Sequence, residues 1–193
     1  MLAGPGSGKT RVITHRIARL VATDVPPQQI LAITFTNKAA REMAERVDVL
    51  LPDVKPWVGT FHRFCAQMLR RHARGVGLEP NYTILDMSDQ RRLLKSVMAA
   101  LGHDATPFPP PKIAARISQV QNRLVNPQSL AENPASGIGD FQGRIVAEVY
   151  PAYQKALQQS NAVDFDDLLL HVATLLEENP ELRSQLDERF RYI

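Results

Sequence analysis

The segment of residues 3–10, with the sequence AGPGSGKT, constrains the fold more than any other part of the chain. Its glycines allow consecutive backbone N–H groups to turn inward around a phosphate, because no side chain stands in the way. Lys9 adds a mobile cation, and the hydroxyl of Thr10 suits a Mg²⁺ ion that bridges two phosphates. The pattern matches G-x-x-x-x-G-K-[ST], except that Ala3 replaces the first glycine. The segment therefore predicts a loop that binds a nucleoside triphosphate.

The flanking sequence favours this interpretation over an ordinary glycine-rich turn. Leu2-Ala3 is typical of the end of a strand, and apolar residues at helical spacing follow from about Gly8 to Ala22. Strand, loop and amphipathic helix thus occur in the order that a phosphate-binding loop needs. We predict that ATP is bound by Ala3, Gly4, Pro5, Gly6, Ser7, Gly8, Lys9, Thr10 and Arg11, that Lys9 and Thr10 are the catalytic residues, and that Thr10 contacts the metal.

Strand and helix patterns alternate along the first half of the chain, which predicts an α/β fold with a parallel sheet and crossover helices. Thr36 or Asn37 is suited to cap one predicted helix, and Thr60 another that runs to about Ala73. Short apolar runs predict strands at residues 30–35, 57–59 and 82–85, and residues 191–193 are typical of a chain entering a further strand.

The middle of the chain has the pattern of helices alone. Pro151 is predicted to break or kink one of them, because proline lacks the backbone donor and clashes with the preceding turn. Asn126-Pro127 is interpreted as a connector, and Asn179-Pro180 as a cap followed by the first helical residue. The predicted helices are 89–101, 112–124 and 142–159, followed by two more after Asp164 that divide at Asn179.

Composition narrows the class of protein. With 193 residues and 44% apolar content, the chain can bury a globular core. Its net charge is only +3, but residues 1–80 hold twelve basic side chains against six acidic ones, which suits a polyanionic partner. The apolar runs are too short to cross a bilayer, no secretory leader is visible, and the single Cys65 cannot form an internal disulfide. We therefore expect a cytoplasmic protein without a membrane partner.

Four blocks in order resemble motifs I, Ia, Ib and Ic of the UvrD/PcrA/Rep superfamily 1 DNA helicases. They are the loop at 3–10, ILAITFTNKAA at 30–40, VGTFHRF at 58–64 and DFDDLL at 164–169. The resemblance covers essentially the whole chain. It implies a P-loop NTPase (RecA-like) parallel sheet, incomplete at both ends, with an inserted all-helical subdomain. Subdomain 1A corresponds to residues 1–85 and 162–193, and the helical insertion 1B to residues 86–161.

The resemblance also implies contacts with single-stranded DNA and with junctions between single- and double-stranded DNA. Stacking and backbone contacts suit a motor that must pass every base. From the residues alone, a core position at the end of a buried strand is favoured for Phe35, and His62 is compatible with a surface position beside a helix cap. By the resemblance, Phe35 stacks on a base, Thr36, Asn37, Thr60 and His62 reach phosphate or sugar, and Lys38 and Arg63 add positive charge.

The acidic segment at 164–167 invites a metal-binding interpretation, which we do not favour. Asp164 precedes a leucine-rich helix, and an aspartate there is a good N-cap. Acidic residues in a first helical turn are also favoured by the helix dipole. The resemblance gives this segment a coupling or positioning role instead.

Hydrolysis of ATP needs a carboxylate on Mg²⁺ and another that orients water. In the family these belong to motif II, which the resemblance places after Ile193, so we expect this chain alone neither to hydrolyse ATP nor to unwind DNA. The complete protein is expected to be a helicase that moves 3′ to 5′. Two alternatives remain: the helicase subunit of a helicase–nuclease of the RecB or AddA kind, and a noncatalytic DNA-binding remnant.

Overall fold

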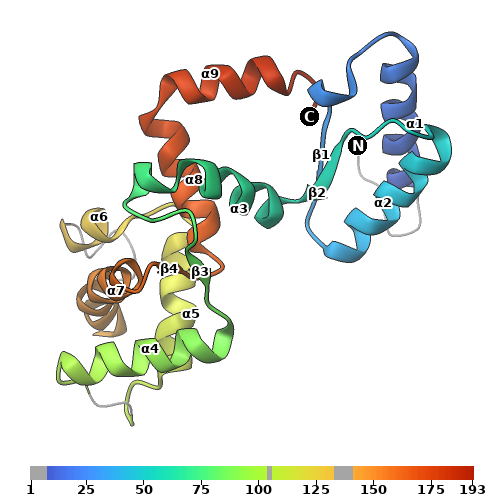
Figure 1. Ribbon diagram of the computed structural model, residues 1–193. Coiled ribbons are helices and arrows are strands. Elements are labelled where there is room, and N and C mark those ends of the chain that lie inside the picture. The colour runs from blue at the N-terminus through green and yellow to red at the C-terminus, as the bar shows by residue number, and fades with distance from the viewer. Residues whose placement is uncertain (1–7, 104–105, 133–140) are drawn as a thin grey trace. The chain divides into compact units, whose positions relative to one another are not determined.

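The computed structural model describes residues 8–103, 106–132 and 141–193, and its backbone divides into two compact units. The first unit comprises residues 1–64 and 176–193, and the second comprises residues 65–175. Figure 1 shows both as mixtures of helices with very short strands, and the helices predominate. The fold is therefore mixed α/β, and the division into subdomains 1A and 1B stays a prediction.

A small parallel sheet lies at the centre of the first unit. Strand β1 (Leu31–Thr34) pairs with β2 (Trp57–Thr60), and the register runs from Leu31 opposite Trp57 to Thr34 opposite Thr60. On the other edge of β1, Leu31 N donates to the carbonyl of Tyr192 at 2.8 Å, and Tyr192 N donates to Gln29 O at 3.1 Å. The predicted strands at 30–35 and 57–59 are confirmed, and the segment at 191–193 begins parallel pairing as expected.

Two helices of equal length pack together beside this sheet. Helix α1 (Lys9–Ala22) contacts α2 (Asn37–Leu50), and α2 also contacts both strands. A one-turn 3-10 helix, η1 (Pro27–Gln29), joins α1 to β1, and α9 (Pro180–Arg189) completes the unit. Apolar residues of both helices and of the β1 segment form the core of this unit, whose buried members are Ile17, Ile30, Ala32, Met43 and Val47.

Two helices continue across the boundaries between the units. Helix α3 (Phe61–His72) follows β2 directly, and α8 (Asp167–Glu178) precedes α9. Helix α3 buries Cys65, Met68 and Leu69, which recur at three- and four-residue steps. A short 3-10 helix, η2 (Ala73–Val76), ends the α3 segment.

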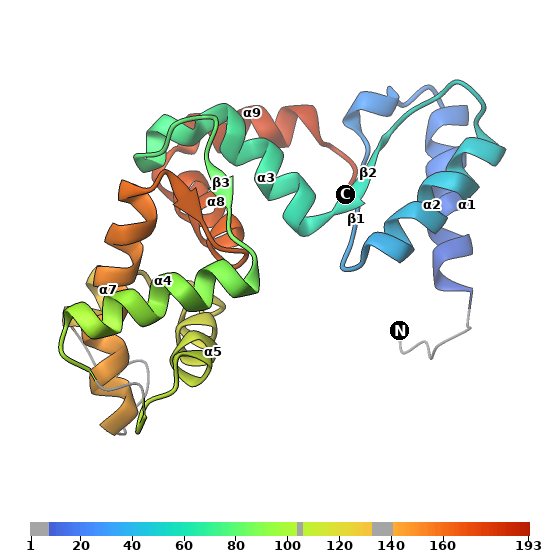
Figure 2. The same cartoon turned by 60° about the horizontal axis from the view of Figure 1, so that its bottom comes forward.

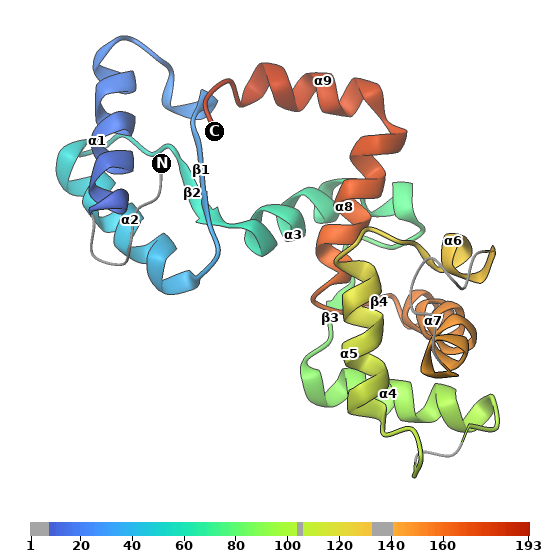
Figure 3. The same cartoon turned by 180° about the vertical axis from the view of Figure 1, so that it is seen from behind.

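The second unit is a helical cluster with one very short parallel strand pair. Strand β3 (Thr83–Ile84) pairs with β4 (Ala162–Val163), while α4 (Met87–Ala100), α5 (Pro110–Gln121), α6 (Pro127–Glu132) and α7 (Phe141–Gln159) supply the helices. Helices α4, α5 and α7 contact one another in pairs, and Figures 2 and 3 show them within this unit. The core includes Leu94, Ile113, Val146, Tyr150 and Tyr153, each at most 1% exposed.

Three details of this unit differ from the sequence prediction. Helix α7 continues through Pro151, so the predicted break is wrong, while the kink that was its alternative stays a prediction. Asn126-Pro127 is not a mere connector, because Asn126 Oδ1 accepts from Ser129 N at 2.7 Å and Pro127 opens α6. Strand β4 was not predicted at all, although its partner β3 was.

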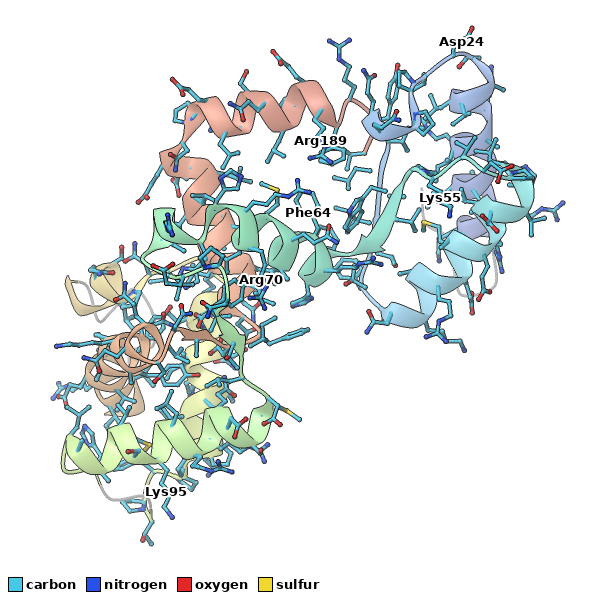
Figure 4. The ribbon with its side chains drawn as sticks, viewed as in Figure 1. Asp24, Lys55, Phe64, Arg70, Lys95 and Arg189 are labelled. Atoms are coloured by element: carbon cyan, nitrogen blue, oxygen red, sulfur yellow. The ribbon has the colours of Figure 1, made fainter. Side chains whose placement is uncertain are left out.

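Basic side chains of the α3 segment contact the loop that follows it in the second unit. Figure 4 shows Arg70, whose guanidinium lies 4.1 Å from the centre of the Tyr82 ring and donates to Pro80 O at 2.6 Å. Arg74 pairs with Glu79 at 3.6 Å on the surface. Arg70 and Arg74 therefore make contacts within the chain that stabilise the fold. Among the described residues, no helix has the length and apolar character needed to cross a bilayer.

Candidate nucleotide and nucleic-acid interface

Several helix N-termini gather at one side of the first unit. In Figures 1–3, β1 and β2 run toward the side from which α1 starts, and α2 begins there as well. Asp24, just past the C-terminus of α1, lies at the opposite end in Figure 4. Helix N-termini expose unpaired backbone N–H groups with a partial positive charge. This side of the unit is thus suited to anions.

The start of α1 has the backbone that the predicted phosphate loop needs. Gly8 adopts φ 78° and ψ 12°, a left-handed conformation that favours glycine. Its carbonyl accepts from Val12 N at 3.0 Å, so the helix begins at once after it. Lys9 is exposed and Thr10 is half-buried. Of the predicted ATP-binding residues, Ala3, Gly4, Pro5, Gly6 and Ser7 lie outside the described residues.

A residue replacing Gly8 would be limited by conformation rather than by space. A Cβ added there meets no atom within 4 Å among the residues that the structure describes. Arg11, the last residue predicted to bind ATP, is exposed one turn further on. It lines a groove between α1 and α2 together with His15 and Arg46.

The next helix start follows β1. Thr36 is the N-cap of α2, as predicted, and its hydroxyl accepts from Ala39 N at 3.2 Å. Asn37 and Lys38 are exposed in the first turn, which holds no acidic residue in this fully described helix. The exposed ammonium of Lys38 therefore lies on the same surface as the positive end of this helix.

Thr60 has the corresponding place after β2. It is 6% exposed, and its hydroxyl accepts from Arg63 N at 3.2 Å, so the predicted cap of α3 is confirmed. His62 is half-buried and Arg63 is exposed. Because Thr34 pairs with Thr60, the parallel register brings the predicted residues of motifs Ia and Ib to one edge of the sheet.

Phe35 stands out at this edge because 84% of it is exposed. The alternative that Phe35 is a core residue is therefore wrong. Its ring centre lies 5.3 Å from that of Phe61, which is 38% exposed, and the rings are inclined by 35°. The other aromatic residues nearby do pack inward: Phe64 makes edge-to-face contacts with Trp57 at 5.5 Å and Phe190 at 6.0 Å.

The acidic segment before α8 forms a buried polar cluster in the second unit. Asp164 Oδ1 accepts from Asp167 N at 2.8 Å, and Asp167 Oδ2 accepts from Asp164 N at 3.0 Å. Asp164 thus accepts from the first N–H of α8, as a capping side chain does, although the helix begins only at Asp167. Both side chains are almost fully buried, at 1% and 0% exposure. The position of Asp164 before a leucine-rich stretch indicated a capping role, but the burial of the two carboxylates depends on distant residues.

The residues that surround these two carboxylates come from helices α4, α5 and α7, and they donate hydrogen bonds from uncharged groups. Gln121 Nε2 donates to Asp167 Oδ1 at 2.7 Å, Gln154 Nε2 donates to the same oxygen at 2.6 Å, and Tyr153 donates to Asp164 Oδ2 at 3.1 Å. Gln90 also reaches Asp164 at 3.1 Å. Burial, with the neighbouring Asp164 charge as a second cause, raises the pKa of Asp167 to about 8. Sequence reasoning missed these partners.

Comparison with known proteins identifies the class to which this arrangement belongs. The UvrD/REP helicase N-terminal domain family matches residues 1–193. The chain is 44% identical over 196 residues to the ATP-dependent DNA helicase PcrA of Staphylococcus aureus and 43% identical to that of Staphylococcus epidermidis. Each alignment covers 100% of this chain and 26% of the relative.

The chain therefore belongs to the UvrD/REP helicase N-terminal domain family. The resemblance to UvrD/PcrA/Rep helicases that motifs I to Ic indicated is confirmed. The chain spans about a quarter of the length of the curated relatives that it matches.

Proposed function

We propose that this chain is the ATP-binding part of a DNA helicase that uses ATP hydrolysis to move 3′ to 5′ along single-stranded DNA. The match of the whole chain to helicase N-terminal domains carries the proposal. The arrangement of the first unit supports it, because the start of α1 and the carboxyl ends of β1 and β2 face the same side. A nucleotide bound at the start of α1 and a DNA strand bound at the ends of β1 and β2 would therefore be close enough for one to affect the binding of the other.

ATP binding is proposed for residues 3–11, within a P-loop NTPase fold of the RecA-like kind. The left-handed Gly8, which has no side chain to cap α1, and the exposed Lys9 fit a triphosphate. The half-buried hydroxyl of Thr10 fits the coordination of Mg²⁺, an ion that neutralises charge on the phosphates. The residues of this chain thereby bind and orient the phosphates.

Single-stranded DNA and its junctions with duplex DNA are the proposed partners of the residues in motifs Ia and Ib. The exposed Phe35 offers a stacking surface, and Lys38 and Arg63 offer charge beside two helix N-termini. Asn37, which is exposed, and His62, which is half-buried, are proposed to contact the phosphate or sugar of the strand. Thr36 and Thr60 already use their hydroxyls as caps, so we propose that they hold the two helix starts in position for the strand.

The ATP site is tested by a lysine substitution in the complete protein that the gene encodes. Lys9→Ala removes the cation from the phosphate loop, so DNA-stimulated ATPase turnover is expected to fall by about a hundredfold or more. Binding of single-stranded DNA is expected to change little, because Phe35, Lys38 and Arg63 are untouched.

Lys55→Ala is the matched control, since Lys55 is also an exposed lysine but lies in the loop before β2 (Figure 4). It is expected to leave turnover unchanged. Equal turnover in Lys9→Ala and the unsubstituted protein would contradict the proposed role of Lys9. Absence of any DNA-stimulated turnover in the unsubstituted complete protein would instead favour a noncatalytic remnant.

A further inference from the structure

The aromatic pair at the edge of the sheet follows from the strand register. Thr34 of β1 lies opposite Thr60 of β2, so the next residues along the two strands, Phe35 and Phe61, leave the sheet beside each other. Their ring centres are 5.3 Å apart, within the usual contact range of aromatic pairs. The two rings therefore form one continuous apolar surface, which we call the ring pair.

The ring pair is not needed to fill the core of the first unit. Phe64 packs edge to face against both Trp57 and Phe190, and these three rings form a separate aromatic cluster. Phe61 begins the apolar stripe of α3, yet it is 38% exposed, while Cys65, one turn further on, is 7% exposed. A pair of exposed phenylalanines is costly in water and marks a surface that contacts a ligand.

The surroundings of the ring pair select the chemistry of that ligand. The ring pair lies between the first turns of α2 and α3, and neither of these fully described helices has an acidic residue in its first turn. Lys38 and Arg63 are exposed in those turns. A flat apolar surface next to two positive helix ends fits a flat ring that carries a phosphate, which is the composition of a nucleotide unit.

We propose that Phe61 is a second base-stacking residue and forms, with Phe35, a platform for an unpaired base of the DNA strand. This rests on the proposed function and adds a residue to it, because that proposal has Phe35 alone as the stacking side chain. An unpaired base is required, since bases in a duplex are already stacked on their neighbours. The contact involves ring faces and is therefore indifferent to the identity of the base.

A cycle that removes either the protein ring or the base tests the platform. The 193-residue chain is titrated with two fluorescent strands of equal length and charge, dT12 and a 12-unit abasic strand, and anisotropy gives the ratio of their affinities. The variants are Phe61→Leu, Phe35→Leu and Phe61→Tyr. Leucine keeps apolar bulk without a ring, and tyrosine restores a ring.

The unsubstituted chain is expected to prefer dT12 over the abasic strand by roughly fivefold or more, the scale of one stacked base. Phe61→Leu and Phe35→Leu are each expected to lose most of that preference while keeping their affinity for the abasic strand. Phe61→Tyr is expected to keep the preference. Circular dichroism of each variant verifies that helix content is unchanged.

The outcomes separate this inference from the proposed function. If Phe35→Leu loses the preference and Phe61→Leu keeps it, Phe61 is not a stacking residue and DNA binding at this edge still stands. If Phe61→Tyr loses the preference for dT12 as fully as Phe61→Leu does, altered packing rather than ring stacking explains the loss. The platform is then rejected. If the chain binds neither strand, both the inference and the proposed DNA interface are overturned.

Discussion

The carboxyl group of Asp167 is enclosed by neutral side chains, and this decides how it titrates. Its folded-state pKa of about 8 lies above the ordinary value of roughly 3.9, mainly because burial disfavours the charged form. The folded chain therefore keeps a proton that the unfolded chain releases. The resulting stabilisation is fully present below pH of about 4 and is lost as the pH rises through about 8.

Asp167→Asn is expected to remove this contribution. Asparagine stays neutral at every pH, and a rotated amide can pair with Gln121 Oε1, which is buried without a hydrogen-bond partner among the described residues. The free energy of unfolding of the variant relative to the unsubstituted chain should rise between pH 5 and 8, by up to about 1.4 kcal/mol per pH unit. Urea unfolding at several pH values measures this difference.

Asp86→Asn is the control for the same exchange of carboxylate for amide. Asp86 caps α4 by accepting from Ser88 N and Asp89 N, and these hydrogen bonds lower its pKa. Its contribution to stability is therefore lost only as the pH falls through that lowered pKa, outside the range of 5 to 8. A flat difference for Asp167→Asn over that range, or an equal slope for both variants, would contradict the protonation of Asp167.

Single residues also mark the limit of what the sequence could predict. The cap made by Asp164 followed from its position before a leucine-rich stretch, which is local information. The burial of Asp167 depends on Gln121 and Gln154, which are distant in sequence and carry no pattern of their own. Similarly, composition favoured a core position for Phe35, and only the resemblance to a DNA-binding motif indicated the exposure that the structure has.

Among the elements, helix α2 owes its start to a single hydroxyl. The hydroxyl of Thr36 caps the N-terminus of this fully described helix by accepting from Ala39 N. Thr36→Ala is expected to lower the free energy of unfolding by about 1 kcal/mol, because the N–H of Ala39 loses its acceptor. Thr36→Ser keeps the hydroxyl and is expected to cost much less.

Trp57 gives a direct measurement of this effect. It is the single tryptophan of the chain and lies in β2, which α2 contacts, so its fluorescence during urea unfolding follows the unit that contains the cap. The midpoint should shift for Thr36→Ala and stay near the original for Thr36→Ser. Equal shifts for both variants would show that the hydroxyl is not the stabilising group.

Elements with a clear period were predictable and the shortest ones were not. Helices α1 to α5 show apolar residues at three- and four-residue steps, and their positions agree with the prediction. Strand β4 has only two residues, too few for any alternation to appear. Asn126-Pro127 was interpreted as a connector, yet it forms a cap and the first helical proline. Asn179-Pro180 was interpreted as a cap and a helix start, and α9 does begin at Pro180, although the side chain of Asn179 makes no capping hydrogen bond.

At the scale of the whole molecule, the distribution of charge along the chain indicates a polyanionic partner more clearly than the net charge of +3 does. The first eighty residues hold the basic excess, and two of its members, Lys38 and Arg63, stand at the proposed DNA edge. Binding to phosphates releases counterions, so the affinity for dT12 is expected to fall as salt increases. Each phosphate contact contributes about 0.7 to the slope of log affinity against log salt.

Neutralising these two side chains tests whether the charge acts at this edge or over the whole surface. The double substitution Lys38→Gln and Arg63→Gln is expected to reduce the magnitude of the slope by about 1.4, because two phosphate contacts are lost. Arg91→Gln with Lys95→Gln removes the same charge from the exposed face of α4 (Figure 4) and is expected to leave the slope unchanged. If both pairs reduce the slope equally, attraction is diffuse, because net charge alone cannot distinguish two faces. The basic excess would then favour encounter with DNA without defining where the strand lies.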